Sequence, residues 1–286
     1  MARPRDIGVI DTLIGFRDVR QVIHVPSAKD QGERHPAEYM FKDIPEELSE
    51  AADRYAAIDE TVAQMDRHGV RVGVISLVDE RTPEALRRHP DRFVALVSID
   101  PNEGLMEAVR KIQRSVDEHG VRGVSIFPAG IKPQVALNEK HWYPIYAKCA
   151  ELGLAVFTTT GVPGPRAPMM AQYVGHLDEV CYDFPELKIV MRHGGEPWVD
   201  LAVKLLLKWP NLYYSTTAFA PKYWPKEIID FANTRGADKV IYGGYFPFGL
   251  ELDRIFREMD ETPFNPDVWP KFLRDNAAGV LGIAAP

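Results

Sequence analysis

Eight short runs rich in apolar and β-branched residues recur along the chain, and longer stretches with helical periodicity lie between them. We interpret the runs as strands near residues 7–14, 70–78, 93–100, 121–128, 154–160, 188–195, 212–218 and 239–245. Stretches such as 103–119 and 138–152 repeat their apolar residues about every 3.6 positions, as helices covering a parallel sheet do. Eightfold alternation of strand and helix predicts an α/β fold, a single (β/α)8 TIM barrel.

The length of 286 residues is close to the roughly 250 of a plain barrel, which predicts one domain over residues 1–286. The alternative, an open doubly wound sheet, places a glycine-rich phosphate turn after its first strand. The first strand here ends in Asp11-Thr12-Leu13-Ile14-Gly15, without that turn. The stretch from Phe16 to Pro45 then interrupts the alternation. We expect a long loop after strand one, either a lid over the ligand-binding face or an excursion that contacts no ligand.

Charge and composition restrict the possible partners. The formal net charge of −7 disfavours binding to nucleic acid or to an anionic membrane surface. No apolar run approaches the ~20 residues of a membrane span, and the N-terminus has no signal-peptide pattern. The two cysteines, Cys149 and Cys181, lie in helical pattern and suit unpaired thiols in a reducing compartment. We therefore expect a cytoplasmic protein with a small-molecule substrate, and we leave open whether it is a homo-oligomer.

Functional groups of a β/α barrel lie at the C-terminal ends of its strands. In this chain those positions hold Asp11, Ser76, Asp100, Ser125, Thr159, His193, Thr216 and Tyr245. They include no nucleophilic triad, phosphate loop, cysteine cluster or pair of histidines with metal-ligand spacing.

Three segments carry a family resemblance, and further matches elsewhere support it. The segments are Val9-Ile10-Asp11-Thr12, the run from Lys188 to Trp198 (KIVMRHGGEPW) and the run from Gly243 to Phe248 (GGYFPF). The supporting matches are Asp91-Arg92-Phe93, Gly153 to Phe157 and Asn276 to Gly282. Together they make the chain similar, over essentially its whole length, to the amidohydrolase-related family, which implies the barrel fold.

Typical members of that family bind a divalent metal through two histidines on strand one, one on strand five, often one on strand six and an aspartate on strand eight. A carboxylated lysine or a glutamate on strand four joins them in some members. The matching positions here are Leu13, Gly15, Thr159, His193 and Tyr245, with Ser125 near the strand-four position. Only His193 is a good ligand, because leucine and glycine offer no donor and neutral hydroxyls are poor ones. We therefore predict no bound metal and no other cofactor.

Three residues are the candidates for catalysis. His193 has an ordinary pKa that suits a general base or acid, and strand alternation places it with Ile189 and Met191 on the face that the resemblance makes the barrel interior. Tyr245 is a candidate proton donor to an oxyanion. Asp11 is a candidate partner for a cationic group. The alternatives are that His193 is a hydrogen-bonded relic of a metal site, that Tyr245 fills volume, and that Asp11 supports the structure.

Further residues are candidates for substrate binding, each with a structural or solvated alternative. Hydroxyls at strand ends can bind substrate or satisfy backbone groups, and basic loop residues can hold a carboxylate, phosphate or thioester-linked group. Glu196 is expected as the first-turn acid of a helix as well as a candidate contact. The candidate binding residues are Thr159, Ser125, Arg166, Lys222, Lys42 and Glu196.

Aromatic residues gather near the ends of strands seven and eight, which predicts an aromatic-walled pocket for a ring-containing substrate even though some of them must be core. These residues are Tyr213, Tyr214, Tyr223, Trp224, Tyr242, Phe246 and Phe248.

The sequence therefore favours a metal-independent enzyme that uses acid–base chemistry, as a lyase, decarboxylase or hydrolase, on a small organic acid. Inferring a reaction from a fold is an analogy, since one barrel hosts many chemistries. A non-catalytic binding or partner protein on a degenerate barrel is the alternative. A metallohydrolase would require His193 to combine with loop residues such as His24 or His35 in an unfamiliar site.

Overall fold

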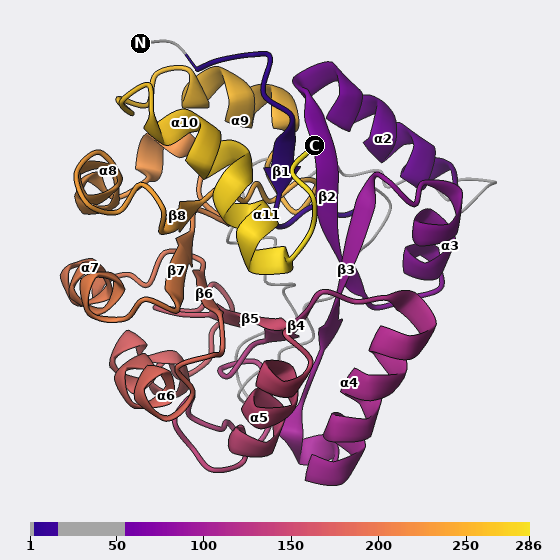
Figure 1. Ribbon diagram of the computed structural model, residues 1–286, viewed down its shortest axis with the longest axis vertical. Coiled ribbons are helices and arrows are strands. Elements are labelled where there is room, and N and C mark those ends of the chain that lie inside the picture. Colours follow the sequence, from indigo (N-terminus) through magenta and orange to yellow (C-terminus); the bar gives the residue numbers. More distant parts are fainter. Residues whose placement is uncertain (1–2, 17–54) are drawn as a thin grey trace.

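The structure, a computed structural model, describes residues 3–16 and 55–286 (Figure 1). Eight strands form one sheet in the order of the sequence, and every neighbouring pair is parallel. All eight predicted strands are confirmed. They are β1 (Val9–Asp11), β2 (Val70–Leu77), β3 (Phe93–Ser98), β4 (Gly123–Ile126), β5 (Ala155–Thr159), β6 (Ile189–Arg192), β7 (Leu212–Ser215) and β8 (Val240–Ile241).

The helices surround the strands, as the ring of coils in Figure 1 shows. Those between strands are α2 (Ala56–His68), α3 (Arg81–Arg88), α4 (Leu105–His119), α5 (Tyr143–Glu151), α6 (Leu177–Asp183), α7 (Val199–Lys208) and α8 (Lys226–Ala232). After β8 come α9 (Leu252–Met259), α10 (Val268–Pro270), the π-helical turn η5 (Lys271–Asp275) and α11 (Asn276–Leu281). Short 3-10 turns are η1 (Pro101–Glu103), η2 (Met170–Gln172), η3 (Val174–His176) and η4 (Pro221–Tyr223).

The sheet closes between its first and last strands, which makes it a TIM barrel. Ile14 and Phe246 form a parallel bridge, and the Gly15 N–H donates to the Phe246 carbonyl at 2.8 Å. Closure removes the two exposed sheet edges that an open sheet would leave.

Alternate strand residues face the barrel axis or the helices. Val190 faces the axis, because Arg192, two residues further along β6, contacts Thr12 and Ser125 across the barrel. The cluster around Val190 contains Ile10, Val72, Val74, Leu96, Ala155, Phe157 and Ile241 from the strands, and Ala277, Ala278, Val280 and Leu281 from α11.

The helix α11 closes the N-terminal end of the barrel. Lys188, directly before β6, donates from Nζ to the Gly279 carbonyl of α11 at 2.7 Å. The opposite, C-terminal end is therefore the end at which a ligand would enter.

The predictions about helices and cysteines are confirmed in part. The helix expected at 103–119 is α4, whereas the one expected at 138–152 begins only at Tyr143. Cys149 and Cys181 are buried free thiols in helices, as predicted, and burial raises the pKa of Cys181 to about 12. In the part of the chain that the structure describes, no helix has the length and apolarity to cross a bilayer. The proposed lid, apart from Phe16, lies outside the described residues, as do His24, His35 and Lys42.

Candidate active site

Arg192, the last residue of β6, lies in the polar centre of the barrel. Its Nη1 donates to Ser125 Oγ on β4 at 3.2 Å, and its Nη2 donates to the Thr12 carbonyl after β1 at 3.1 Å. The guanidinium carbon lies 4.7 Å from the centre of the Phe157 ring on β5, a cation–π contact. The side chain therefore reaches across the barrel axis while only 4% exposed.

The expected face of β6 was wrong. Ile189 and Met191, which we placed in the interior with His193, belong to the outer cluster that packs against the helices. Val190 and Arg192 face the axis instead. The backbone explains the error, because His193 has a φ of +62° and the strand alternation ends before it.

The positive charge of Arg192 has little compensation. Burial lowers the pKa of its guanidinium to about 9, against the opposing influence of Tyr245 and Asp11, so it remains protonated at neutral pH. No carboxylate lies within ion-pair distance of it among the described residues, and its buried Nε has no hydrogen-bond partner. A buried cation without an ion pair is costly unless an anion completes it.

His193 follows directly, in a left-handed turn with Gly194 and Gly195, whose φ values are +90° and +72°. Its backbone N–H donates to Thr217 Oγ1 at 3.0 Å, which holds the turn against the end of β7. A positive φ is unusual outside glycine, and such residues cluster at functional sites. Ala218, after β7, is the other non-glycine example among the described residues.

The imidazole of His193 is held in its neutral form. Burial, and then the neighbouring Arg192, lower its pKa to about 3, with the Thr217 hydrogen bond opposing them weakly. Its Nδ1 is buried and has no hydrogen-bond partner in the described structure. The ring can therefore act through Nδ1 as a proton acceptor or hydrogen-bonding group.

Tyr245 lies against His193, as predicted from their positions on strands six and eight. The two ring centres are 5.5 Å apart and the rings are nearly perpendicular, at 86°. Burial raises the pKa of the Tyr245 phenol to about 12, so it is a neutral donor at physiological pH. The side chain is 6% exposed and also contacts the Phe248 ring. Proton donor and packing residue both remain compatible with this placement.

Asp11 braces the junction of β1 and β8. Its Oδ1 accepts from the backbone N–H groups of Gly244 at 2.7 Å and Leu13 at 3.0 Å. Burial raises the pKa of this carboxyl to about 6, although both hydrogen bonds, Tyr242 and Arg192 oppose the rise. A Cβ on Gly244 would lie only 2.4 Å from Asp11 Oδ2, so the close approach requires glycine. This placement favours the supporting role over direct catalysis.

The candidate binding residues separate into two groups. Ser125 is half-buried inside the barrel, and Thr159, also half-buried, pairs in register with Arg192 across β5 and β6. Arg166 lies on a loop and Lys222 in the 3-10 turn η4, and both are exposed; the Lys222 ammonium lies 4.9 Å from the Tyr223 ring. Lys42 lies outside the described residues.

Glu196 is half-buried but lies before helix α7 and not in its first turn, so that prediction was wrong. The helix begins after Trp198, and Asp200 is the acid of its first turn.

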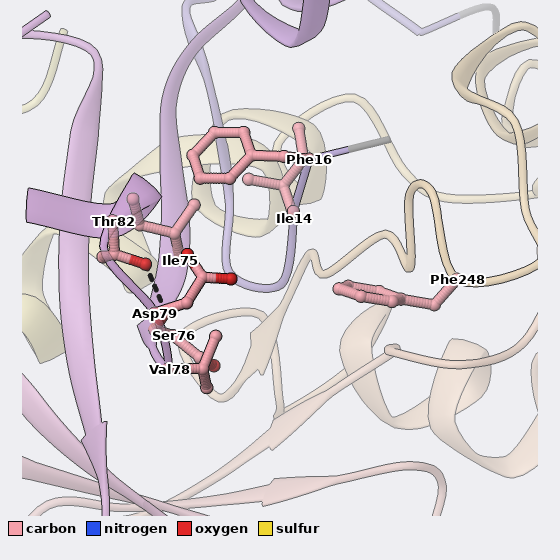
Figure 2. Close-up of a pocket in the computed structure, with 9 residues that line it drawn as sticks. Ile14, Phe16, Ile75, Ser76, Val78, Asp79, Thr82 and Phe248 are labelled. Atoms are coloured by element: carbon pink, nitrogen blue, oxygen red, sulfur yellow. Dashed lines mark hydrogen bonds between the residues drawn. The ribbon is translucent and has the colours of Figure 1, made fainter. Parts of the chain in front are cut away.

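The aromatic residues of strands seven and eight are mostly core. Tyr214, Tyr242, Phe246 and Trp224 are buried, whereas Tyr223 is exposed. Phe248 instead borders a small pocket at the C-terminal end (Figure 2), which is lined by Ile14, Gly15, Phe16, Ile75, Ser76, Val78, Asp79, Thr82 and Phe248. This pocket has room for about a water molecule, so it does not match the predicted ring-binding pocket.

A divalent metal of the family type does not fit the described residues. The guanidinium of Arg192 extends across the axis and would repel a second cation. Within residues 3–16 and 55–286, no three His, Cys, Asp or Glu side chains come together as a ligand set. That the protein binds no metal inside its barrel remains a prediction.

Sequence reasoning missed Arg192 and Thr217. The signal for Arg192 was a single charged residue directly after the apolar run Ile189-Val190-Met191. Thr217 gave no signal, because its role depends on the turn at His193.

Comparisons with solved structures agree with the fold. An uncharacterised TIM-barrel protein from Bordetella bronchiseptica is 26% identical, with 78% of this chain and 82% of that chain covered and a TM-score of 0.71. The 4-oxalomesaconate hydratase of Rhodopseudomonas palustris is 17% identical, with 96% and 95% covered and a TM-score of 0.62. The 5-carboxyvanillate decarboxylase of Sphingomonas paucimobilis is 16% identical, with 79% and 83% covered and a TM-score of 0.60.

No curated protein matches the chain. The family model described as Amidohydrolase matches residues 22–283, which is most of the sequence. The chain belongs to the amidohydrolase family.

Proposed function

We propose that this protein is a metal-independent enzyme that performs acid–base chemistry, of the lyase, decarboxylase or hydrolase kind, on a small organic acid. One observation carries the proposal. The protonated Arg192, the neutral His193 with an unpartnered Nδ1, and the protonated Tyr245 lie together at the C-terminal end of the barrel. Perturbed groups gathered at such an end are typical of active sites.

The three groups have complementary roles in this proposal. Arg192 supplies positive charge next to the reacting centre and stabilises negative charge that develops there. His193 accepts a proton at Nδ1, and Tyr245 donates one from its phenol. Burial and the charge of Arg192 lower the pKa of His193, and a substrate anion next to Arg192 would offset the second effect and raise this pKa.

The names of the structural neighbours support an acid as the substrate. They include 5-carboxyvanillate decarboxylase, 2,6-dihydroxybenzoate decarboxylase complexed with 2,6-dihydroxybenzoate, and 4-oxalomesaconate hydratase. By analogy we propose a ring-containing or unsaturated carboxylic acid for this chain, or its thioester.

A non-catalytic ligand-binding protein is the second candidate. The burial of Tyr245 and Arg192 favours it, because buried polar side chains can bind a small ligand without taking part in a reaction.

A substrate screen in the presence of a chelator tests the proposal. Purified protein is incubated with aromatic and unsaturated carboxylic acids and with thioesters, and product formation is followed by mass spectrometry. We expect turnover that survives chelation and is lost in His193→Ala. Turnover that appears only after a divalent metal is added would contradict metal independence. Binding without conversion across the panel would favour the second candidate.

A further inference from the structure

The guanidinium of Arg192 has more hydrogen-bond donors than the described residues satisfy. An arginine presents five N–H donors in a planar fork. The described structure gives Nη1 one acceptor, Ser125 Oγ, and Nη2 one acceptor, the Thr12 carbonyl. Nε, which is buried, has none. A planar fork with free donors matches a ligand that has two acceptor oxygens in one plane.

The charge of Arg192 also has no ion-pair partner in the described part of the chain. Asp11 is the carboxylate that affects it most, but no ion pair joins the two, and Oδ1 of Asp11 is occupied by the N–H groups of Leu13 and Gly244. The face of the Phe157 ring offers only a weak substitute for an anion. Among residues 3–16 and 55–286, therefore, no carboxylate forms an ion pair with this buried charge, and Asp11 influences it only from a distance.

Hydroxyl groups connect this charge to the open end of the barrel. Ser125 and Thr159 are half-buried, and Ser98, which pairs with Ser125 across β3 and β4, is exposed. Ser98 shares the inner face with Leu96, and Thr159 shares it with Phe157, because residues two apart on a strand point the same way. Ser125 Oγ thus contacts the guanidinium directly, and Thr159 lies at the register position of Arg192 on the neighbouring strand.

We infer that Arg192, together with the inner-face hydroxyls of Ser125 and Thr159, forms a carboxylate-binding subsite that takes an aromatic or unsaturated monocarboxylate without a metal. The carboxylate accepts from the guanidinium fork and places the rest of the acid toward His193 and Tyr245. The kind of acid in this inference is taken from the proposed function. The carboxylate of that acid would bind at Arg192 on the barrel axis and not at Arg166 or Lys222.

Binding is measured by titration calorimetry of the full chain in a chelating buffer, with benzoate as the probe and benzamide as its uncharged counterpart. We expect benzoate to bind and benzamide to bind at least roughly tenfold more weakly, because charge-assisted hydrogen bonds are lost. Arg192→Met should lose benzoate binding by a similar factor. The matched control is Arg122→Met, because Arg122 is exposed and directly precedes β4 near the opposite end of the barrel, and this variant should bind as wild type does.

Equal affinity for benzoate and benzamide in the wild-type protein would overturn the subsite, and this comparison holds even where an Arg192 variant does not fold. Unchanged benzoate binding by folded Arg192→Met would also overturn it. Thr159→Val provides a milder test and should weaken benzoate binding several-fold, by roughly the value of one hydrogen bond. Benzoate binding that depends on Arg192, with no turnover of any acid, would retain the subsite and reject the enzyme.

Discussion

Arg192 on β6 reaches across the barrel to Ser125 on β4, with Nη1 3.2 Å from the serine Oγ. This contact ties together two strands that are not neighbours in the sheet. Because the serine accepts from a buried cation, removing the serine and removing the arginine should change stability differently.

We expect Ser125→Ala to lower the free energy of unfolding by about 1–3 kcal/mol, because it leaves a charged donor without its acceptor. Arg192→Met should leave stability unchanged or raise it, since a buried charge without an ion pair is removed and a side chain of similar volume fills the space. Urea denaturation of the two single variants and the double variant measures both effects. A double variant as unstable as Ser125→Ala would show that the serine matters for another reason.

The barrel should contain no stoichiometric transition metal, because Leu13, Gly15, Thr159 and Tyr245 replace the family's ligands and Arg192 lies on the axis. Elemental analysis of dialysed protein is the measurement, and dialysis against a chelator should not change its melting temperature. About one zinc, iron or manganese per chain, retained through dialysis and bound inside the barrel, would disprove this prediction.

Asp11 should make stability depend on pH in an unusual direction. Its pKa is about 6 in the folded protein against an ordinary value of 3.8, so the folded state holds the proton more tightly. Stability contributed by the protonated form is therefore lost as pH rises from about 4 to about 7, by about 3 kcal/mol. Asp11→Asn, which does not titrate, should lose less stability over this range. Parallel pH profiles for Asp11→Asn and wild type would refute the assignment.

Most of the fold was predictable, because apolar runs of strand length separated by helical stretches leave few alternatives to a barrel. The residues at which the strands end could not be predicted. We expected β6 to run to residue 195, but it stops at Arg192 because His193, Gly194 and Gly195 adopt left-handed conformations. Periodicity does not reveal a turn that tertiary packing imposes.

The site was predictable where it depended on topology. His193 and Tyr245 follow alternate strands, so their proximity could be expected and is confirmed. Arg192 was missed because we extended the strand alternation back from His193, whose positive φ shifts the side chains by one position. Arg166 and Lys222 were chosen as cationic clamps from their loops, yet the cation at the axis comes from the strand itself.

Substitutions at two glycines test whether Asp11 stabilises the junction of β1 and β8. Alanine at Gly244 would place its Cβ 2.4 Å from Asp11 Oδ2, so we expect Gly244→Ala to lower the free energy of unfolding by about 1–3 kcal/mol through overpacking. The matched control is Gly279→Ala in α11, where nothing lies within 4 Å and the helix should gain about 0.5–1 kcal/mol. Chemical denaturation measures the free energy of unfolding of both variants. Equal changes in the two would mean that the chain at Gly244 is not tightly packed against Asp11.

The last prediction concerns His193 and Tyr245 as catalytic residues, and it can be measured once a substrate is found. His193→Ala and Tyr245→Phe should each lower kcat by about 10² or more, because each removes a proton-transfer group, while circular dichroism shows the fold intact. Binding of the acid should persist in both variants, since the proposed contacts to its carboxylate come from Arg192. If Tyr245→Phe keeps full activity, the phenol only fills space and Thr159 is the next donor to test. If His193→Ala is also fully active, the reacting centre lies elsewhere, whatever the barrel holds at Arg192.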